Sequence, residues 1–254
     1  MEFNQLPVPT VDVLGIPIGY WTPDTLVDQM VAWALSRSVL KRTILYANVH
    51  VLNTATRHPA LAEELRRASA VYCDGSGVRL GAWLLGQTLP PRLTATDWID
   101  LFCSRARERG LRLYILAGID GVASRAAEIL CARHPGLRIV GSHHGYLGAT
   151  TSVDVIADIN RQEATILIVG MGSPIQERWI AENRHRIDAK VVWAVGGLFD
   201  FIAGVQERAP AILTRHHLEW LGRLTRDPGR LAGRYLIGNP LFCWRVLRQR
   251  ISQR

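Results

Sequence analysis

Apolar runs rich in valine, isoleucine and leucine recur along the chain, and each ends in glycine, aspartate or asparagine before a helical pattern begins. The runs have strand length, so we expect strands near residues 43–49, 70–73, 112–117, 137–141, 164–170 and 191–196. Helical patterns follow near residues 50–57, 77–86, 121–133, 152–161, 174–186 and 209–225. An earlier strand-like stretch, residues 11–18, precedes a helix that begins after Pro23. Strands that alternate with helices predict an α/β fold, a Rossmann-like, mostly parallel sheet with helices on both faces.

The pattern changes toward the end of the chain. After Pro228 it consists of short amphipathic pieces that contain many arginines and are interrupted by Gly229, Gly233, Gly238 and Pro240. Residues 205–254 hold ten arginines and three acidic residues, so seven of the net eight positive charges lie there. We therefore expect an α/β catalytic domain over residues 1–204 and a basic C-terminal helical appendage over residues 205–254. Such a charge asymmetry indicates a negatively charged partner, either a nucleic acid or an anionic membrane surface.

Composition narrows the class of protein. A hydrophobic content of 48% with 20% charged residues is typical of a globular chain and excludes wholesale disorder. No apolar run approaches the roughly 18–20 uncharged residues of a membrane-spanning helix. The first residues lack the layout of a signal peptide, and the four cysteines contain no C-x-x-C pair. We expect a soluble cytosolic protein without a disulfide framework or a zinc site.

Glycines stand where the predicted strands end, in pairs at 75 and 77, 118 and 121, 170 and 172, and 196 and 197. In an open parallel sheet, ligands bind beyond the carboxyl ends of the strands. Glycine lets a ligand approach the backbone, and the start of the next helix offers free N–H groups to a phosphate. Turns between strands and helices are also rich in glycine for structural reasons alone. Four such turns at one edge nevertheless favour a phosphate-bearing ligand.

Asp74 follows a buried strand and precedes Gly75, which makes it a candidate general base, since partial desolvation would raise the pKa of its carboxyl group. The alternative from spacing alone is that Asp74 caps the helix that begins near Gly77. Asn48 and His50 end the preceding strand and would face the same crevice, although a single histidine there is more often structural.

Other polar residues have equally ordinary alternatives. Gln176 and Glu177 open the helix after Gly172, where a glutamate can simply complement the helix dipole. Arg92 stands in a polar loop, where most arginines are only solvated. The sequence has no D-x-D, no G-x-x-x-x-G-K-[ST], no H-E-x-x-H and no G-x-S-x-G. The loop at Gly170 lacks the third glycine of a dinucleotide fingerprint, which weakens a dehydrogenase interpretation.

Taken together, these segments resemble the WecG/TagA/CpsF family of bacterial glycosyltransferases over roughly residues 10–240. The most specific blocks are G-x-G-x-P-x-Q-E and G-G-x-F-D followed by R-A-P and E-W-x-x-R. The matching residues include Asn48, His50, Asp74–Val78, Arg92, Asp97, Gly118, Gly121, His134, Pro135, Gly141, Gly145, Val169–Glu177, Gly196–Asp200, Gly204, Arg208–Pro210, Glu219, Trp220, Arg223, Pro228, Arg230, Arg234 and Tyr235.

The resemblance implies transfer of a hexose-type sugar from a UDP donor to a polyprenyl-diphosphate-linked sugar in cell-surface polysaccharide synthesis, with inversion and without a metal or other cofactor. It implies that Asp74 is the catalytic base, that Asn48 and Gln176 hold donor or acceptor, and that Arg92 meets the diphosphate. Further substrate contacts are expected at His50, Gly75, Gly170, Gly172, Glu177, Gly197 and Asp200. The C-terminal arginines expected to meet the acceptor diphosphate at the membrane are Arg208, Arg223, Arg230 and Arg234.

Three positions depart from the family pattern. Tyr46 stands where the family often has threonine, Ile175 where it usually has lysine, and Ala95 where glycine is common. Because Tyr46 would reshape one wall of the pocket, the identity of the donor sugar cannot be inferred from any one relative. N-acetylmannosamine, its uronic acid and glucose all remain candidates.

The basic appendage has two physical interpretations. Cationic segments that carry tryptophan and leucine lie in membrane interfaces, which would bring the enzyme to its lipid-linked acceptor at the inner face of the cell membrane. Alternatively, the same side chains pack on the domain and leave a solvated basic face. A nucleic-acid-binding protein and a nucleotide-dependent oxidoreductase are weaker rivals, and we expect no nucleic acid as partner. A homo-oligomer is possible, but nothing in the sequence specifies one.

Overall fold

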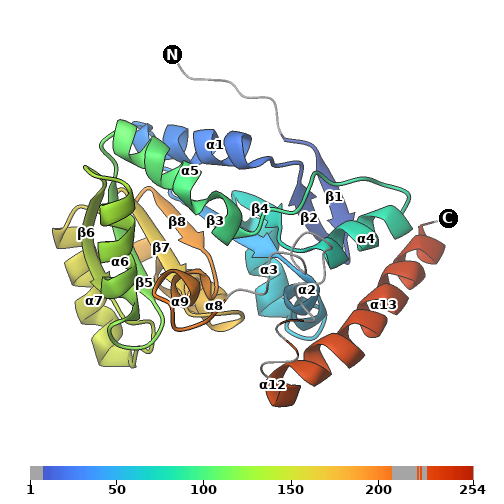
Figure 1. Cartoon of the computed structure of the whole chain (residues 1–254). Coiled ribbons are helices and arrows are strands. Elements are labelled where there is room, and N and C mark those ends of the chain that lie inside the picture. Colours follow the sequence, from blue (N-terminus) through green and yellow to red (C-terminus); the bar gives the residue numbers. More distant parts are fainter. Residues whose placement is uncertain (1–7, 208–221, 223, 225–227, 254) are drawn as a thin grey trace.

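A computed structural model describes residues 8–207, 222, 224 and 228–253. Its main sheet has six parallel strands in the order β4-β3-β8-β7-β5-β6 (Figure 1). The strands are β3 (Arg42–Ala47), β4 (Ala70–Cys73), β5 (Arg112–Ala117), β6 (Arg138–His143), β7 (Ile166–Gly170) and β8 (Val191–Ala194). Every residue of β4, β7 and β8 is buried, which explains why these strands are continuous apolar runs. The predicted α/β fold is confirmed.

Helices cover both faces of this sheet (Figure 1). On one face α1 contacts α5, α5 contacts α9, and α9 contacts α6; on the other α3 contacts α8, which is hydrogen-bonded to α7. The helices are α1 (Pro23–Leu35), α2 (Val49–Ala55), α3 (Pro59–Arg67), α4 (Ser76–Leu84), α5 (Ala95–Glu108), α6 (Val122–Arg133), α7 (Ala149–Arg161), α8 (Ile175–Asn183) and α9 (Leu198–Ile202). The sequence pattern had not singled out α3 and α5. The helix predicted near 209–225 falls almost entirely outside the described residues.

The stretch 11–18, predicted as one strand, is instead a hairpin. It consists of β1 (Thr10–Val13) and the antiparallel β2 (Ile16–Gly19). The two residues between the strands, Leu14 and Gly15, have φ values of 55° and 79°. Two successive residues with positive φ form the tight turn that joins antiparallel strands, so the apolar run reverses direction where a single strand was expected.

The segment after Pro228 is also more continuous than predicted. Helix α12 (Pro228–Ala232) leads through a π-helical turn (Gly233–Ile237) into α13 (Gly238–Ser252). Gly233 and Gly238 therefore do not interrupt the helical path. Pro240 lies in the first turn of α13, directly after the π turn, and the helix continues past it to Ser252.

Helix α13 packs against the α/β layers. Its Phe242 and Val246 are buried, and a Cβ atom on Gly81 of α4 would lie 2.7 Å from the Phe242 ring, so glycine permits this approach. Gln249 accepts a hydrogen bond from the Leu14 N–H at 2.8 Å, and Arg245 donates to Asn53 Oδ1 at 2.6 Å. These bonds fasten α13 to the hairpin and to α2. The domain boundary near residue 205 stays a prediction.

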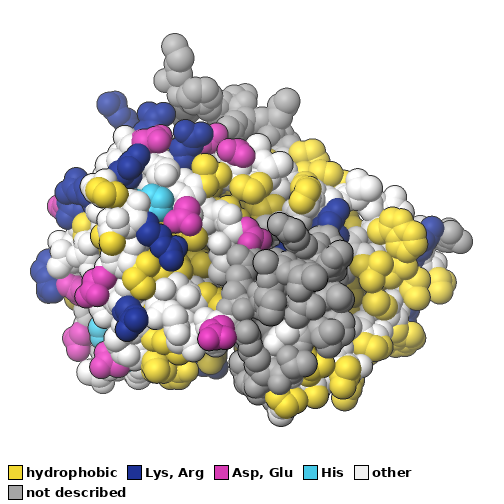
Figure 2. All heavy atoms as spheres, viewed as in Figure 1, with side chains coloured by type: hydrophobic (Ala, Val, Ile, Leu, Met, Phe, Trp, Pro, Cys, Tyr) yellow, Lys and Arg dark blue, Asp and Glu magenta, His cyan; other side chains and the backbone are white. Residues whose placement is uncertain are grey.

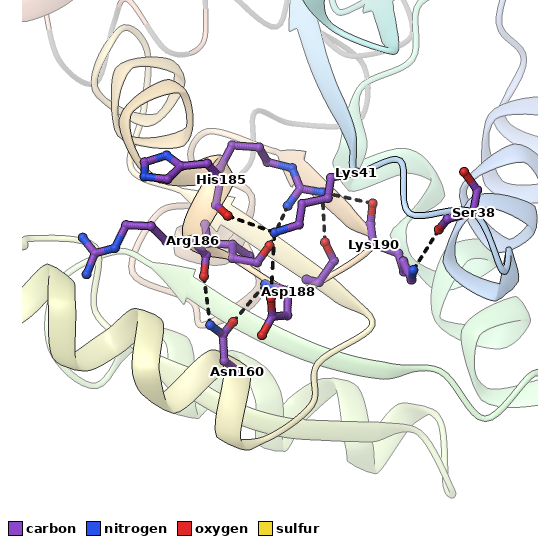
Figure 3. Close-up of polar contacts among 10 residues, drawn as sticks. Ser38, Lys41, Asn160, His185, Arg186, Asp188 and Lys190 are labelled. Atoms are coloured by element: carbon purple, nitrogen blue, oxygen red, sulfur yellow. Dashed lines mark hydrogen bonds and ion pairs between the residues drawn. The ribbon is translucent and has the colours of Figure 1, made fainter.

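Side chains also tie the amino ends of the neighbouring strands β3 and β8 (Figure 3). Lys41, just before β3, donates to the His185 carbonyl at 3.1 Å, and Lys190, just before β8, donates to the Ser38 carbonyl at 2.8 Å. Asn160 of α7 bonds Arg186 O and the Asp188 N–H, each at 2.9 Å. The segment that leads into β8 is therefore held by neighbours on both sides.

At their carboxyl ends, β3 and β8 are not paired with each other. Arg42–Ile44 pair with Val191–Trp193, whereas β3 beyond Ile44 pairs only with β4. The helix after β3, α2, contacts α3 on one face, and the helix after β8, α9, contacts α5 and α6 on the other. Neighbouring strands whose connections leave to opposite faces create the crevice in which α/β proteins bind ligands.

Gly170, at the carboxyl end of β7, sets the packing of the central strands. A Cβ atom there would lie 2.7 Å from Gly196 O and 2.9 Å from Ala117 Cβ. We expect Gly170→Ala to lower the free energy of unfolding by about 1–3 kcal/mol, because backbone on two sides would have to move. Gly148→Ala, where nothing lies within 4 Å of the new atom, is the control. Urea denaturation checks this, and equal stability of the two variants would contradict the packing role.

Candidate active site

A cleft of about 410 Å³ opens at the carboxyl ends of β3 and β4. The strand ends and α4 form one wall, and the π turn and α13 form the other. It is lined by Asn48, Val49, His50, Asp74, Gly75, Ser76, Gly77, Leu80, Arg92, Thr94, Arg234, Tyr235, Asn239, Phe242 and Cys243. The predicted residues Asn48, His50, Asp74, Gly75, Arg92 and Arg234 are thus brought together, although they come from four separate parts of the chain.

Asp74 lies on this wall directly after β4. Its N–H donates to the Ala47 carbonyl at 2.8 Å, so the end of β3 holds its backbone. Asn48 Nδ2 lies 3.5 Å from Asp74 Oδ2. The N-cap of α4 is Gly75, which makes no side-chain cap hydrogen bond. Asp74 is therefore not the N-cap of α4, and it lines the cleft.

Asn48 is the residue that caps a helix. Its Oδ1 accepts a hydrogen bond from the Val51 N–H at 2.9 Å, which fixes the start of α2. Because Oδ1 is engaged in this way, the amide NH₂ group is the part turned toward Asp74. A structural bond thus orients the side chain that contacts the candidate base.

His50 is half-buried in the same cleft. Burial, with a smaller contribution from the positive charge of Arg234, lowers its pKa from 6.5 to about 4. The imidazole is therefore neutral at pH 7, so the positive charge of the cleft comes from guanidinium groups.

Two arginines bring that charge. Arg92 has a largely buried side chain, 13% exposed, and its Nη2 lies 3.9 Å from Asp97 Oδ2. Arg234 reaches the cleft from the π turn. Arg92 is therefore part of a wall and is not merely solvated. Arg230 belongs to α12, and the predicted Arg208 and Arg223 lie outside the described residues.

A second group of predicted residues lies beyond the ends of β7 and β8. Gln176 and Glu177 are 0% and 1% exposed. Gln176 Oε1 accepts from the Gly196 N–H at 3.1 Å, and its Nε2 donates to Glu177 Oε1 at 2.8 Å. Burial raises the pKa of the Glu177 carboxyl group. Glu177 is therefore a buried member of a polar network, which goes beyond complementing the dipole of α8.

The glycines of this region differ in their surroundings. Gly170 is buried by packing, whereas Gly172, with φ of 78°, and the exposed Gly197 leave room for a ligand. The Asp200 carboxylate faces Gly118 and Gly197, since Cβ atoms built on them would lie 3.2 and 3.3 Å from it. Substrate contacts at these positions remain predictions.

Sequence reasoning missed Asn239, Tyr235 and Cys243 as part of the cleft wall. Their approach depends on how α13 docks, and no local pattern reports that. It also missed the hydrogen bonds of Ser173. This residue stands inside the G-x-G-x-P-x-Q-E block, so the motif itself was a signal that could have identified it.

The comparisons with known proteins fit this geometry. Residues 11–254 match the glycosyl transferase WecG/TagA/CpsF family. This chain belongs to that family. Two curated relatives, from Staphylococcus aureus strains MRSA252 and MW2, are 30% and 29% identical over 93% of this chain and 91% of theirs. Both are named N-acetylglucosaminyldiphosphoundecaprenol N-acetyl-beta-D-mannosaminyltransferase. The resemblance drawn from the motifs is confirmed, and the protein is a glycosyltransferase.

Two features are absent from the described residues of this WecG/TagA/CpsF enzyme. Within those residues, no group of three or more histidine, cysteine, aspartate or glutamate side chains is placed to hold a metal ion. None of the described helices has both the length and the apolar character needed to cross a membrane.

Glu177 gives this enzyme a testable pH dependence. Below the ordinary value of 4.5, the carboxyl is protonated in both folded and unfolded chains; as the pH rises, the unfolded chain ionises first, which destabilises the fold. Glu177→Gln should therefore gain stability over the wild type as the pH rises above 4.5 in urea titrations. Glu182→Gln, on the exposed side of α8, is the control. A difference between Glu177→Gln and wild type that does not grow with pH would count against this account.

Proposed function

We propose that this enzyme transfers a hexose-type sugar from a UDP donor to a polyprenyl-diphosphate-linked sugar, with inversion and without a metal ion. The observation that carries the proposal is the cleft in which one carboxylate, Asp74, shares walls with Arg92 and Arg234. The relatives' names favour N-acetylmannosamine as the sugar and N-acetylglucosaminyl-diphosphoundecaprenol as the acceptor. The process served is the synthesis of a cell-envelope polysaccharide.

In this reaction, the Asp74 carboxylate takes the proton from the attacking hydroxyl group of the acceptor sugar. The hydroxyl oxygen forms a bond to the anomeric carbon while the bond from that carbon to the UDP phosphate oxygen breaks. UDP leaves with the electron pair, and attack from the opposite side inverts the anomeric centre. Asn48 orients Asp74, and the neutral His50 supplies a hydrogen-bonding edge without competing for the phosphate charge.

Guanidinium groups are suited to the diphosphate in this cleft. A guanidinium fork donates two parallel hydrogen bonds to phosphate oxygens, and a partly buried one is weakly screened. Arg92 and Arg234 reach the cleft from opposite walls, so a diphosphate between them would meet positive charge on both sides. We assign the acceptor diphosphate to this pair. Arg208, Arg223 and Arg230 remain candidates for the same role.

Replacing the base tests the assignment. Asp74→Asn keeps the size of the side chain and removes its basicity, so turnover should fall about 10²–10⁴-fold while the Kd for UDP changes little. Asp120→Asn is the matched control, because Asp120 also follows a strand at this edge but does not line the cleft. Acceptor-dependent UDP release and calorimetry with UDP check the two quantities. Turnover of Asp74→Asn near that of Asp120→Asn would remove Asp74 from the mechanism.

The appendage supports a second part of the proposal, peripheral docking on the cytoplasmic membrane surface. Trp244, Leu247 and Ile251 form an outward stripe on α13 and are 56%, 44% and 75% exposed. Figure 2 shows hydrophobic side chains gathered on the side of the molecule where α13 lies. Arg248 stands beside the stripe, 5.7 Å from the Trp244 ring. Apolar stripes flanked by arginine and tryptophan suit an anionic lipid interface.

Binding to vesicles tests the docking. A triple variant with serine at 244, 247 and 251 should lose most of its sedimentation with vesicles that contain 30% anionic lipid, because about 0.8 kcal/mol is lost per CH₂ withdrawn from lipid. The control places serine at 35, 39 and 40, where Leu35, Val39 and Leu40 are also exposed but do not belong to α13. Unchanged sedimentation of the α13 variant would exclude this surface.

A further inference from the structure

Tyr46 connects the two halves of the site, and it does so where β3 and β8 have separated. It is buried, and its hydroxyl lies 3.2 Å from Ser173 Oγ in the loop after β7. A Cβ atom on Gly196, beyond the end of β8, would lie 2.8 Å from the same hydroxyl. The Tyr46 side chain thus lies where the pairing of β3 with β8 has ended, and Gly196 has no side chain that would clash with its hydroxyl.

The direction of the hydrogen bonds follows from counting protons. Ser173 has a single O–H, which donates to Glu177 Oε1 at 2.6 Å. The Ser173 oxygen therefore accepts from Tyr46, whose O–H is the donor. Burial raises the pKa of Tyr46, which keeps that proton in place. The result is a directed chain, from Tyr46 to Ser173 to Glu177.

Gln176 closes the network. It donates to Glu177 Oε1 and accepts from the Gly196 N–H, so the loops after β7 and β8 are joined. Glu177 Oε2, by contrast, is buried and has no hydrogen-bond partner among the residues that the structure describes. A buried polar atom left unpaired costs free energy, so this network is not the most stable way to fill the space. Such a cost is expected where geometry at a site matters more than stability.

The same stretch of β3 also supports the candidate base. Ala47, next to Tyr46, accepts the backbone hydrogen bond of Asp74, and Asn48 contacts the Asp74 carboxylate. At the end of β3, Ala47 and Asn48 thus hold Asp74, while the Tyr46 hydroxyl holds Ser173. The separation between the cleft and the loops after β7 and β8 depends on this short piece of chain.

We propose that Tyr46 is a positioning residue for sugar transfer, acting through Ser173 and Glu177 to hold the loop after β7 at a fixed distance from Asp74. This inference rests on the proposed function, because it assumes that the donor lies against that loop while the acceptor occupies the cleft. Displacements of about 1 Å in such an arrangement can cost up to 10²-fold in rate.

The test compares two phenols on paired strands. Tyr72 lies opposite Tyr46 in the ladder, and its hydroxyl accepts from Trp193 Nε1 at 3.3 Å inside the core, away from the loop. Tyr46→Phe should lower kcat about 10-fold with the KM of donor and acceptor nearly unchanged, since it disturbs placement rather than binding. Tyr72→Phe should keep kcat within about twofold of wild type while losing similar thermal stability, on the order of 1 kcal/mol.

A double variant tests whether Tyr46 and Ser173 act through one series of hydrogen bonds or affect kcat independently. Ser173→Ala should lower kcat as much as Tyr46→Phe, and the two together should be no worse than either alone, because both break one connection. Wild-type transfer is measured first in the same assay: its absence with every UDP-sugar would overturn the proposed function. If wild type is active, an unchanged kcat in Tyr46→Phe, an equal loss in Tyr72→Phe, or multiplying losses in the double variant would overturn the positioning role alone.

Discussion

The site depends on the incomplete pairing of β3 with β8. These neighbours are hydrogen-bonded only from Arg42 to Ile44, and their amino ends are tied by Lys41 and Lys190. Beyond Ile44 the strands separate, α2 leaves toward one face, and α9 leaves toward the other. The Tyr46 network lies across this opening, whereas the cleft lies at the ends of β3 and β4, beside α4 and α13.

The two sides of that opening have different electrostatic character. The cleft side has a carboxylate and two guanidinium groups, and its histidine is neutral at pH 7 because burial lowers the pKa to about 4. The loop side is closed and hydrogen-bonded, with a glutamate whose pKa is raised by burial. In the proposed reaction, the charged side meets the acceptor and its diphosphate, and the bonded side keeps the donor loop in place. Because the charged groups and the hydrogen-bonded network are separate, the candidate base Asp74 can lie close to the rigid loop after β7.

Much of this arrangement could be predicted from the sequence, because the fold obeys local rules. Buried parallel strands are apolar runs, and the residues that end them, such as Asp74 and Asn48, meet at one edge. The hairpin at Leu14 was missed because an apolar run does not show where it turns. Helices α3 and α5 carry apolar residues at helical spacing and could have been found. The docking of α13 and the bond between Tyr46 and Ser173 join residues far apart in the chain, and no periodicity reports such contacts.

The most direct test of this account is a transfer assay on the purified full-length chain, with EDTA present. A panel of UDP-sugars is offered with a short-chain prenyl-diphosphate-linked N-acetylglucosamine, and both UDP release and the mass of the lipid product are measured. We expect UDP release with one donor, dependent on the acceptor, and a product heavier by a single sugar residue. Release with no donor, together with no binding of UDP by calorimetry, would contradict it.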